Sequence, residues 1–208
     1  GEKNFRSTTR DVSRLIEELK VEGVDGLVVD LRSNGGGSLQ EAQSLTGLFI
    51  RTGPTVQVRK ARRPNARVYR DEDDRTAWDG PLAVLVNRLS ASASEIFAGA
   101  IQDYQRGLVI GTQTFGKGTV QTLVPLNRGQ LKITEAKFYR VSGDSTQHQG
   151  IVPDIAYPDV FGIDNIGEST LEDALTWDTI KPAVYRQTNN IQPYLERLRV
   201  NHERRVAQ

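Results

Sequence analysis

The chain has 208 residues, with 27 lysines and arginines against 26 aspartates and glutamates, and a formal net charge of +1. A chain of this length buries a sizeable core and can hold one domain plus an appendage. The near-zero charge argues against a nucleic-acid partner, and no apolar run approaches the ~18 residues of a membrane span. Cysteine is absent, which excludes disulfides, thiolate metal sites and a cysteine nucleophile. Methionine is also absent, even at position 1, and we expect the chain to be a piece of a longer protein.

Apolar patterns predict helices and strands in alternation over the first half of the chain. Helical spacing predicts helices over 8–20, 38–49 and 92–106. We expect Thr8 to cap the first of them. Short apolar runs predict strands at 26–32, 55–58, 81–87 and 107–111. Because strands and helices alternate, we expect an α/β fold with a mostly parallel sheet and crossover helices.

The rest of the chain does not continue this alternation of apolar strand and helix patterns. Segment 58–80 carries a basic half followed at once by an acidic run, and we expect a solvated surface excursion, with a protein-contact loop as the alternative. Residues 119–126 and 130–141 read as two strands of a β-hairpin around the turn at 127–129. A helix over 194–206 would be marginal without a partner surface.

The segment Gly111 to Thr119, "GTQTFGKGT", nearly spells a phosphate-binding loop. Gly118 stands where that loop needs a hydroxyl, and a strand pattern follows where a helix is required, so we reject nucleotide binding. Lys117 then needs another interpretation, because no acidic residue lies between positions 111 and 121. It is either an exposed lysine on a glycine turn or a lysine beside apolar groups. Burial lowers the pKa of a lysine, and a lysine so placed can act as a general base.

The stretch "SASASE" places three serines between a predicted strand and a predicted helix. Only Ser92 forms a capping box, with Glu95 three residues later. This position puts Ser92 at a helix N-terminus beyond the carboxyl end of a buried strand, where ligands bind in open α/β sheets. The free amide of Ala93 would favour a developing oxyanion there. The alternative is an ordinary capped helix with no chemistry.

A glycine triplet follows the first strand in "DLRSNGGG". Glycines let backbone amides approach a bound atom, although three glycines are often only a loop. Three loops after successive strands thus offer a serine, a lysine and bare amides. A serine–lysine dyad is a known variant of serine nucleophile catalysis.

Four blocks of the sequence together resemble a known family. They are "GLVVDLRSNGGG", "LVNRLSASASEIFAGA", "IGTQTFGKGTVQ" and "KFYRVSGDSTQHQGIVPDI". In this order, over about residues 10 to 158, they look like the signature blocks of the carboxyl-terminal processing (tail-specific) proteases, serine peptidases with a Ser-Lys dyad. The tail, with "DALTWDTI", resembles the C-terminal extension of the bacterial periplasmic members.

The resemblance implies a ClpP/crotonase-like α/β core, a peptidase domain over 1–160 and a C-terminal helical extension over 161–208. It implies endopeptidase cleavage of protein or peptide substrates with apolar C-termini, in the periplasm, without a cofactor or metal. Members usually carry a PDZ domain before this region, and no PDZ-like segment is present here. A need for an adaptor protein stays open.

The family's functional positions map onto this chain residue by residue. Ser92 would be the nucleophile, Lys117 the general base and Gln121 the residue that orients the lysine. If 117–121 is extended, the spacing of four puts Lys117 and Gln121 on one face. The oxyanion hole would combine the amides of Ala93 and a glycine, Gly36 first and Gly37 as its rival. Supporting positions are Arg32, Glu95 and Thr114.

Other titratable residues are expected to lie outside the chemistry. Asp103 also matches a family position, but eleven residues along a helix place it ~16 Å from Ser92, and we expect a structural role. His148 and His202 read as surface or satisfied residues. Two other functions stay open: a non-catalytic module that binds an apolar ligand or peptide on the same fold, and acyl-thioester chemistry at the glycine amides.

Overall fold

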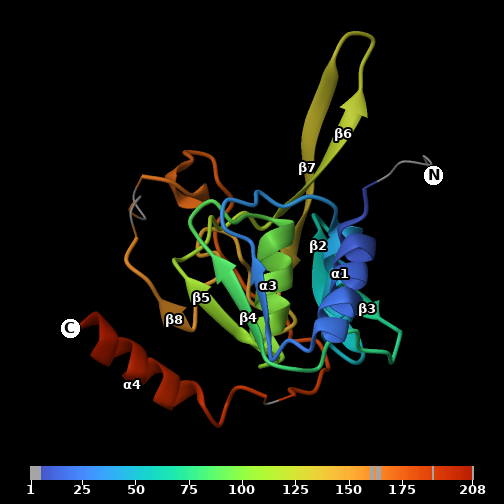
Figure 1. Cartoon of the computed structure of the whole chain (residues 1–208). Coiled ribbons are helices and arrows are strands. Elements are labelled where there is room, and N and C mark those ends of the chain that lie inside the picture. The colour runs from blue at the N-terminus through green and yellow to red at the C-terminus, as the bar shows by residue number, and fades with distance from the viewer. Residues whose placement is uncertain (1–5, 160–161, 163–164, 189, 208) are drawn as a thin grey trace.

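The computed structural model describes residues 6–159, 162, 165–188 and 190–207. A four-stranded parallel sheet runs through it in the order β1-β4-β5-β8 (Figure 1). Its strands are β1 (Leu27–Asp30), β4 (Leu82–Val86), β5 (Leu108–Gly111) and β8 (Ile155–Ala156). Val84 and Val109 are fully buried, because β4 and β5 are central strands made almost entirely of apolar residues. The predicted parallel sheet is confirmed.

A second, antiparallel sheet has the order β3-β2-β7-β6. Its strands are β2 (Gly53–Lys60), β3 (Arg67–Asp71), β6 (Thr119–Pro125) and β7 (Gln130–Tyr139). β6 and β7 form the predicted hairpin, and its distal half projects well beyond the rest of the protein (Figure 1). Strand β6 begins two residues after Lys117, so the base of this hairpin lies where the lysine loop ends.

Helix α3 (Ala93–Asp103) packs against both sheets and is buried along almost its whole length. Its Phe97 and Ile101 belong to the core of the parallel sheet, whereas Ile96 packs with residues of β2 and β7. Helices α1 (Thr8–Glu22) and α2 (Leu39–Gly47) lie beside it, and α2 contacts α3 directly. The N-terminus of α3 is therefore held rigidly at the carboxyl end of β4.

The cap of α1 differs from the predicted one. Ser7, not Thr8, occupies the cap position, and its hydroxyl accepts a hydrogen bond from the Arg10 amide at 3.2 Å. The Glu41 carboxylate of α2 accepts hydrogen bonds from the Ser7 hydroxyl at 3.0 Å and the Thr9 amide at 2.9 Å. These bonds fasten the start of α1 to α2.

The charged segment 58–80 is more ordered than the sequence predicts. Arg67–Asp71 forms β3 and pairs with β2, and Trp78 is buried, so the prediction of a purely solvated excursion was wrong. The strand-forming residues Val68 and Tyr69 lie between charged neighbours that mask the pattern.

The predicted C-terminal helix is confirmed as α4 (Leu195–Val206). It is preceded by a short 3-10 helix, η1 (Glu168–Thr170), and by an extended segment, residues 171–188, that we call the C-terminal strap. The strap is bonded to the body at several places, and His202 of α4 contacts the Ala156 carbonyl oxygen at 3.0 Å. The predicted domain boundary between residues 160 and 161 lies outside the described residues. None of the helices in the described part of the chain has the length and apolar character that a membrane crossing requires.

Candidate active site

Ser92 occupies a strained turn between β4 and α3. Its φ is 56° and its ψ is −113°, a backbone conformation that L-residues rarely adopt. Ser92 directly precedes the first residue of α3, so the partial positive charge at the N-terminus of this helix lies next to Ser92. Such strain persists only where neighbouring structure enforces it, and it concentrates at functional sites.

The three serines of "SASASE" have different environments. Ser90 is fully buried, donates to the Leu31 carbonyl oxygen at 2.7 Å and accepts from the Asn87 amide at 3.0 Å. Ser94 is buried and donates to the Asn34 carbonyl oxygen at 3.0 Å. The Ser92 hydroxyl lies in a capping box with Glu95, but it donates no hydrogen bond to a described residue. The outer two serines thus fasten the glycine loop to the serine turn and leave Ser92 available.

The glycine turn lies directly against Ser92. A methyl group added at Gly36, whose φ is +94°, would come within 2.5 Å of the Ala91 carbonyl oxygen and 2.7 Å of the Ala93 amide nitrogen. Only glycine therefore fits at this position. Asn34 keeps the glycine turn close to the serine turn, because its carbonyl oxygen also accepts a hydrogen bond from the Ala91 amide at 3.0 Å.

Two backbone amides at this junction are free in the described structure. Neither the Ala93 amide nor the Gly37 amide has a hydrogen-bond partner among the described residues. The Gly36 amide, in contrast, donates to the Asn34 side-chain oxygen at 3.0 Å. Of the two glycines predicted for an oxyanion hole, Gly37 is the one with an available donor in this conformation.

The Glu95 carboxylate joins the serine turn to the lysine loop. One oxygen accepts from the Thr114 hydroxyl at 2.5 Å and the Gly116 amide at 2.7 Å. The other accepts from the Ser92 amide at 2.7 Å and the Lys117 amide at 3.0 Å. Burial raises the pKa of Glu95 to about 7, although these hydrogen bonds favour its charged form. One buried carboxyl group therefore sets the relative position of Ser92 and Lys117.

The loop that carries Lys117 is held on every side. The Phe115 amide donates to the Ser90 carbonyl oxygen at 3.0 Å. The Gly118 amide donates to the side-chain oxygen of fully buried Gln147 at 2.9 Å. The buried Arg88 guanidinium donates to the Thr114 carbonyl oxygen. Lys117 itself is half-buried, and among the described residues its ammonium group has no ion pair or hydrogen bond.

A cleft of about 340 Å³ brings the predicted catalytic residues together. It is lined by Gly37, Ser38, Leu39, Ser92, Ala93, Ile96, Lys117, Thr119, Val120, Gln121, Lys132 and Phe138. Gln121 is exposed, and its amide donates to the Thr134 hydroxyl at 3.3 Å. Lys117 and Gln121 therefore lie on the wall of one cleft, although no hydrogen bond joins their side chains here.

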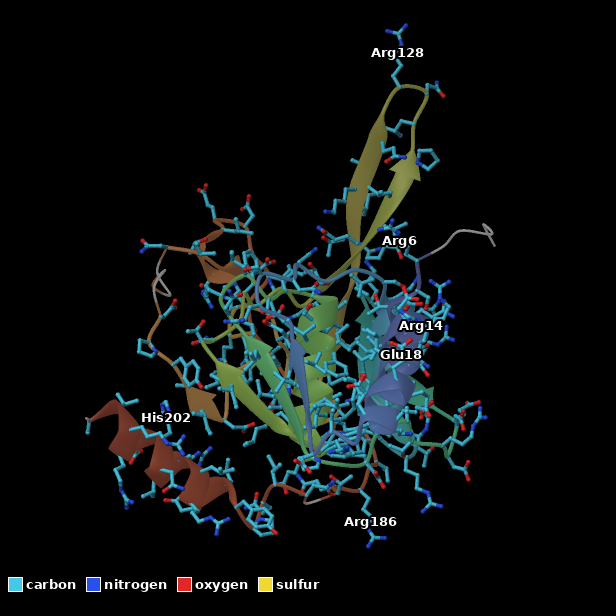
Figure 2. All side chains as sticks on the ribbon, viewed as in Figure 1. Arg6, Arg14, Glu18, Arg128, Arg186 and His202 are labelled. Carbon is cyan, nitrogen blue, oxygen red and sulfur yellow. The ribbon has the colours of Figure 1, made fainter. Side chains whose placement is uncertain are left out.

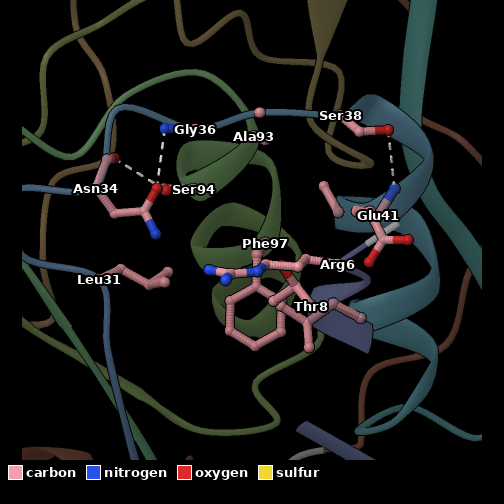
Figure 3. Close-up of a pocket in the computed structure, with 13 residues that line it drawn as sticks. Arg6, Thr8, Leu31, Asn34, Gly36, Ser38, Glu41, Ala93, Ser94 and Phe97 are labelled. Carbon is pink, nitrogen blue, oxygen red and sulfur yellow. Dashed lines mark hydrogen bonds between the residues drawn. The ribbon is translucent and has the colours of Figure 1, made fainter. Parts of the chain in front are cut away.

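A second, mainly apolar cavity of about 280 Å³ adjoins this cleft and shares Gly37, Ser38 and Ala93 with it. Figure 3 shows Leu31 and Phe97 on its walls below the glycine turn. Ala42 and Leu45 of α2 complete its apolar lining, and Arg6, Thr8 and Glu41 also line it. This cavity can hold an apolar side chain next to the free amides.

Two further residues that the sequence singled out, Arg32 and Asp103, do not line the cleft. Arg32 does not contact the glycine turn through its side chain and instead pairs with Asp30 on the surface, at 2.6 Å. Asp103 forms an ion pair with Arg140 at the far end of α3, in line with its predicted structural role. Burial raises the pKa of Asp103, and the Arg140 charge opposes the shift.

The two histidines differ from each other. His202 contacts the Ala156 carbonyl oxygen and stacks on the Tyr157 ring, with 5.5 Å between ring centroids. His148 is half-buried, and its Nε2 atom is buried without a hydrogen-bond partner among the described residues, so the prediction of a surface or satisfied residue was wrong for His148. Its amide donates to the Gly116 carbonyl oxygen at 2.9 Å, which makes it part of the wall behind the lysine loop.

Sequence reasoning missed three supporting residues: Asn34, Arg88 and Gln147. An asparagine before glycines is a turn signal, so Asn34 could have been found from its neighbours. Arg88 and Gln147 carry no such signal, because their partners are backbone groups of loops that come together only in the fold.

Comparison with known proteins places the chain in a family. Residues 3–157 match the model of peptidase family S41, and the chain belongs to this family. Residues 162–208 match the C-terminal domain of tail-specific protease.

Curated relatives carry related names. The tail-specific protease of Haemophilus influenzae is 45% identical over 208 residues, which cover 96% of this chain and 30% of that protein. The carboxy-terminal-processing protease of Bartonella bacilliformis is 41% identical over 155 residues, or 74% of this chain and 36% of that protein. This chain therefore spans about a third of the length of these relatives. Among solved structures, the photosystem II D1 C-terminal processing protease matches with a TM-score of 0.67 and 36% identity, over 77% of this chain and 42% of that one.

Proposed function

We propose that this chain is the catalytic part of a serine endopeptidase in which Ser92 is the nucleophile and Lys117 is the general base. The observation that carries the proposal is that both residues line one cleft and are joined through Glu95, while neither side chain donates a hydrogen bond to another described residue. Family membership supports the same reaction class.

The reaction would begin with neutral Lys117, which takes the Ser92 hydroxyl proton as Oγ attacks the carbonyl carbon of the scissile bond. The tetrahedral oxyanion would accept hydrogen bonds from the Ala93 and Gly37 amides at the N-terminus of α3. Lys117 then donates its proton to the leaving amine, and an acyl-enzyme on Ser92 remains. The same lysine activates a water molecule that hydrolyses the acyl ester and restores Ser92.

The surrounding residues would keep this geometry. Glu95 and Thr114 hold the serine turn and the lysine loop together, and Gln121, which lines the same cleft, would orient the Lys117 ammonium group. In the free state, Gly36 serves as the close-packed glycine and Gly37 as the oxyanion donor. A rotation of the Asn34 side chain would release the Gly36 amide as a further donor.

The substrates would be proteins or peptides with apolar C-termini. The apolar cavity beside the Ala93 and Gly37 amides supports an apolar residue next to the cleaved bond. The names of the relatives support selection of substrates by their C-terminal tails, and the bacterial relatives support the periplasm as the location. A PDZ domain in the same polypeptide and an adaptor protein would assist substrate capture, and residues 1–160 and 161–208 would act as peptidase domain and extension.

The test compares variants on a fluorogenic peptide that ends in apolar residues. Ser92→Ala and Lys117→Ala should each lose at least about a hundredfold in kcat/KM, because the dyad acts as a unit. His148→Ala should retain activity within a fewfold. Wild-type hydrolysis in the Lys117→Ala variant would refute the dyad. Peptide binding without any hydrolysis by the wild-type chain would favour a non-catalytic binding module.

A further inference from the structure

The β6–β7 hairpin presents one of its faces to the catalytic cleft. In the antiparallel register, Gln121 pairs with Thr134 and Leu123 pairs with Lys132. Directly paired residues, and residues two apart on one strand, share a face of a sheet. Gln121 and Lys132 both line the cleft, so it is this face that is turned towards Ser92.

Lys132 is an unpaired cation on that face. Its side chain is exposed, and it has no ion pair or hydrogen bond in the part of the chain that the structure describes. The neighbouring lysines of the two long strands differ in this respect. Lys60 pairs with Glu135 at 3.4 Å, and Lys137 is held by Asp178.

The lining of the cleft contains two lysines, Lys117 and Lys132, and no carboxylate group. Lys132 is the lysine of the cleft to which the proposed reaction gives no role as a base, so it can bind a charged group of the substrate. An anionic group of a bound peptide would be attracted to the hairpin side of the cleft. The apolar cavity lies on the other side and meets the cleft at Gly37, Ser38 and Ala93.

We propose that Lys132 binds a carboxylate of the substrate, so that the preferred substrate places an apolar side chain in the cavity beside Ala93 and a carboxylate a few residues away on the hairpin side of Ser92. The inference rests on the proposed peptidase function and adds a charge preference to it. The carboxylate belongs either to an aspartate or glutamate side chain or to the C-terminus of the peptide. Both present the same chemistry to the lysine.

Lys132 lies at the surface, so the effect is modest. Exposed ion pairs correspond to about a twofold to fivefold change in affinity, and salt weakens them. We therefore expect the wild-type chain to prefer a peptide with the carboxylate by about threefold to fivefold in kcat/KM at low salt. The preference should fall as ionic strength rises.

The experiment uses four versions of one fluorogenic peptide with a fixed apolar residue at the cleaved bond. Two carry glutamate or glutamine near the cleavage site, and two carry a free or an amidated C-terminus, which separates the two sources of the carboxylate. The variants are Lys132→Gln and Lys132→Glu. The matched control is Arg128→Gln, which removes a positive charge from the tip of the same hairpin (Figure 2), away from the cleft.

Lys132→Gln should lose the preference for the carboxylate peptide, measured within that variant as the ratio of kcat/KM for the carboxylate peptide to kcat/KM for the neutral peptide. Lys132→Glu should reverse the preference, and Arg128→Gln should keep it. The inference is overturned if Lys132→Gln keeps the preference, if Arg128→Gln loses as much of it, or if the wild-type chain has none. Hydrolysis of all four peptides that survives Ser92→Ala would instead contradict the proposed function, so the two failures are distinguishable.

Discussion

The substitution Glu95→Gln tests whether one buried carboxyl group positions Ser92 and Lys117, the two proposed catalytic residues. Glu95 accepts four hydrogen bonds, two at each oxygen, from Thr114, Gly116, Ser92 and Lys117. A glutamine has a single oxygen in place of these two. Whichever way its amide is turned, two donors face an NH₂ group and lose their acceptor.

Two opposing contributions decide the effect on stability. Each lost hydrogen bond to a charged group costs about 1.5–3 kcal/mol, so two cost about 3–6 kcal/mol. Burial of the charge, which raises the pKa of Glu95 to about 7, opposes this cost, because the glutamine is neutral. The net loss of unfolding free energy at pH 8 should therefore be smaller than the cost of the lost hydrogen bonds. The activity should fall about tenfold to a hundredfold in kcat, because the amides of Ser92 and Lys117 no longer share an anchor.

The pH dependence provides an independent readout. Because the pKa of Glu95 is raised in the folded state, the folded chain binds this proton more tightly than the unfolded chain does. The stability that the proton provides is complete below about pH 4.5 and is lost as the pH rises towards about 7. Glu95→Gln should flatten this decline in urea unfolding curves, whereas Glu18→Gln, at an exposed position of α1 (Figure 2), should leave it unchanged. Wild-type kcat together with an unchanged pH slope in Glu95→Gln would refute the reasoning.

Three further predictions concern the neighbouring structure. Gly36→Ala should destabilise the fold by about 1–3 kcal/mol and abolish peptide hydrolysis, because the φ of Gly36 is +94° and the added methyl group would meet the Ala91 carbonyl oxygen. The methyl group of Gly35→Ala would meet nothing within 4 Å, so this control should be tolerated. Equal melting temperatures and activities of the two variants would contradict this prediction. Ser90→Ala should lower the unfolding free energy by about 1–3 kcal/mol, since two buried backbone groups lose their partner. Ser92→Ala should change the unfolding free energy by less than about 0.5 kcal/mol but end hydrolysis. The reverse pattern in chemical denaturation would show that the roles of the two serines are misassigned. Asp178→Asn should release the C-terminal strap, because it weakens the ion pairs of Asp178 with Arg59 and Lys137. Limited proteolysis should therefore cut the strap faster in Asp178→Asn than in the control variant Glu172→Gln. Identical cleavage rates would show that Asp178 does not anchor the strap.

Much of the fold could be predicted because its strands are apolar and local signals mark their ends. The runs that became β1, β4 and β5 stand out from their surroundings, and the turn at 127–129 marks the β6–β7 hairpin. Strand β3 could not be predicted in the same way. Its Val68 and Tyr69 stand between charged residues, and the strand is recognisable only through its pairing with β2.

The residues of the candidate site also differ in whether a local sequence signal marks them. Ser92 and Lys117 are marked by local chemistry, namely a capping box and a phosphate-like loop that lacks its hydroxyl. The fourfold role of Glu95 was not apparent from a capping box alone, since three of its four donors belong to a loop about twenty residues away. Lys132 gave no local signal at all. Its place in the cleft depends on the register of the hairpin.

The most direct test of the central claim is covalent labelling of Ser92. The wild-type chain and the Lys117→Ala and His148→Ala variants would each be incubated with a fluorophosphonate, which modifies only activated serines, and then mapped by peptide mass spectrometry. We predict one adduct, on Ser92, in the wild-type chain and in His148→Ala, and almost none in Lys117→Ala. Labelling of Lys117→Ala at the wild-type rate, or an adduct on Ser90 or Ser94 in place of Ser92, would contradict the account.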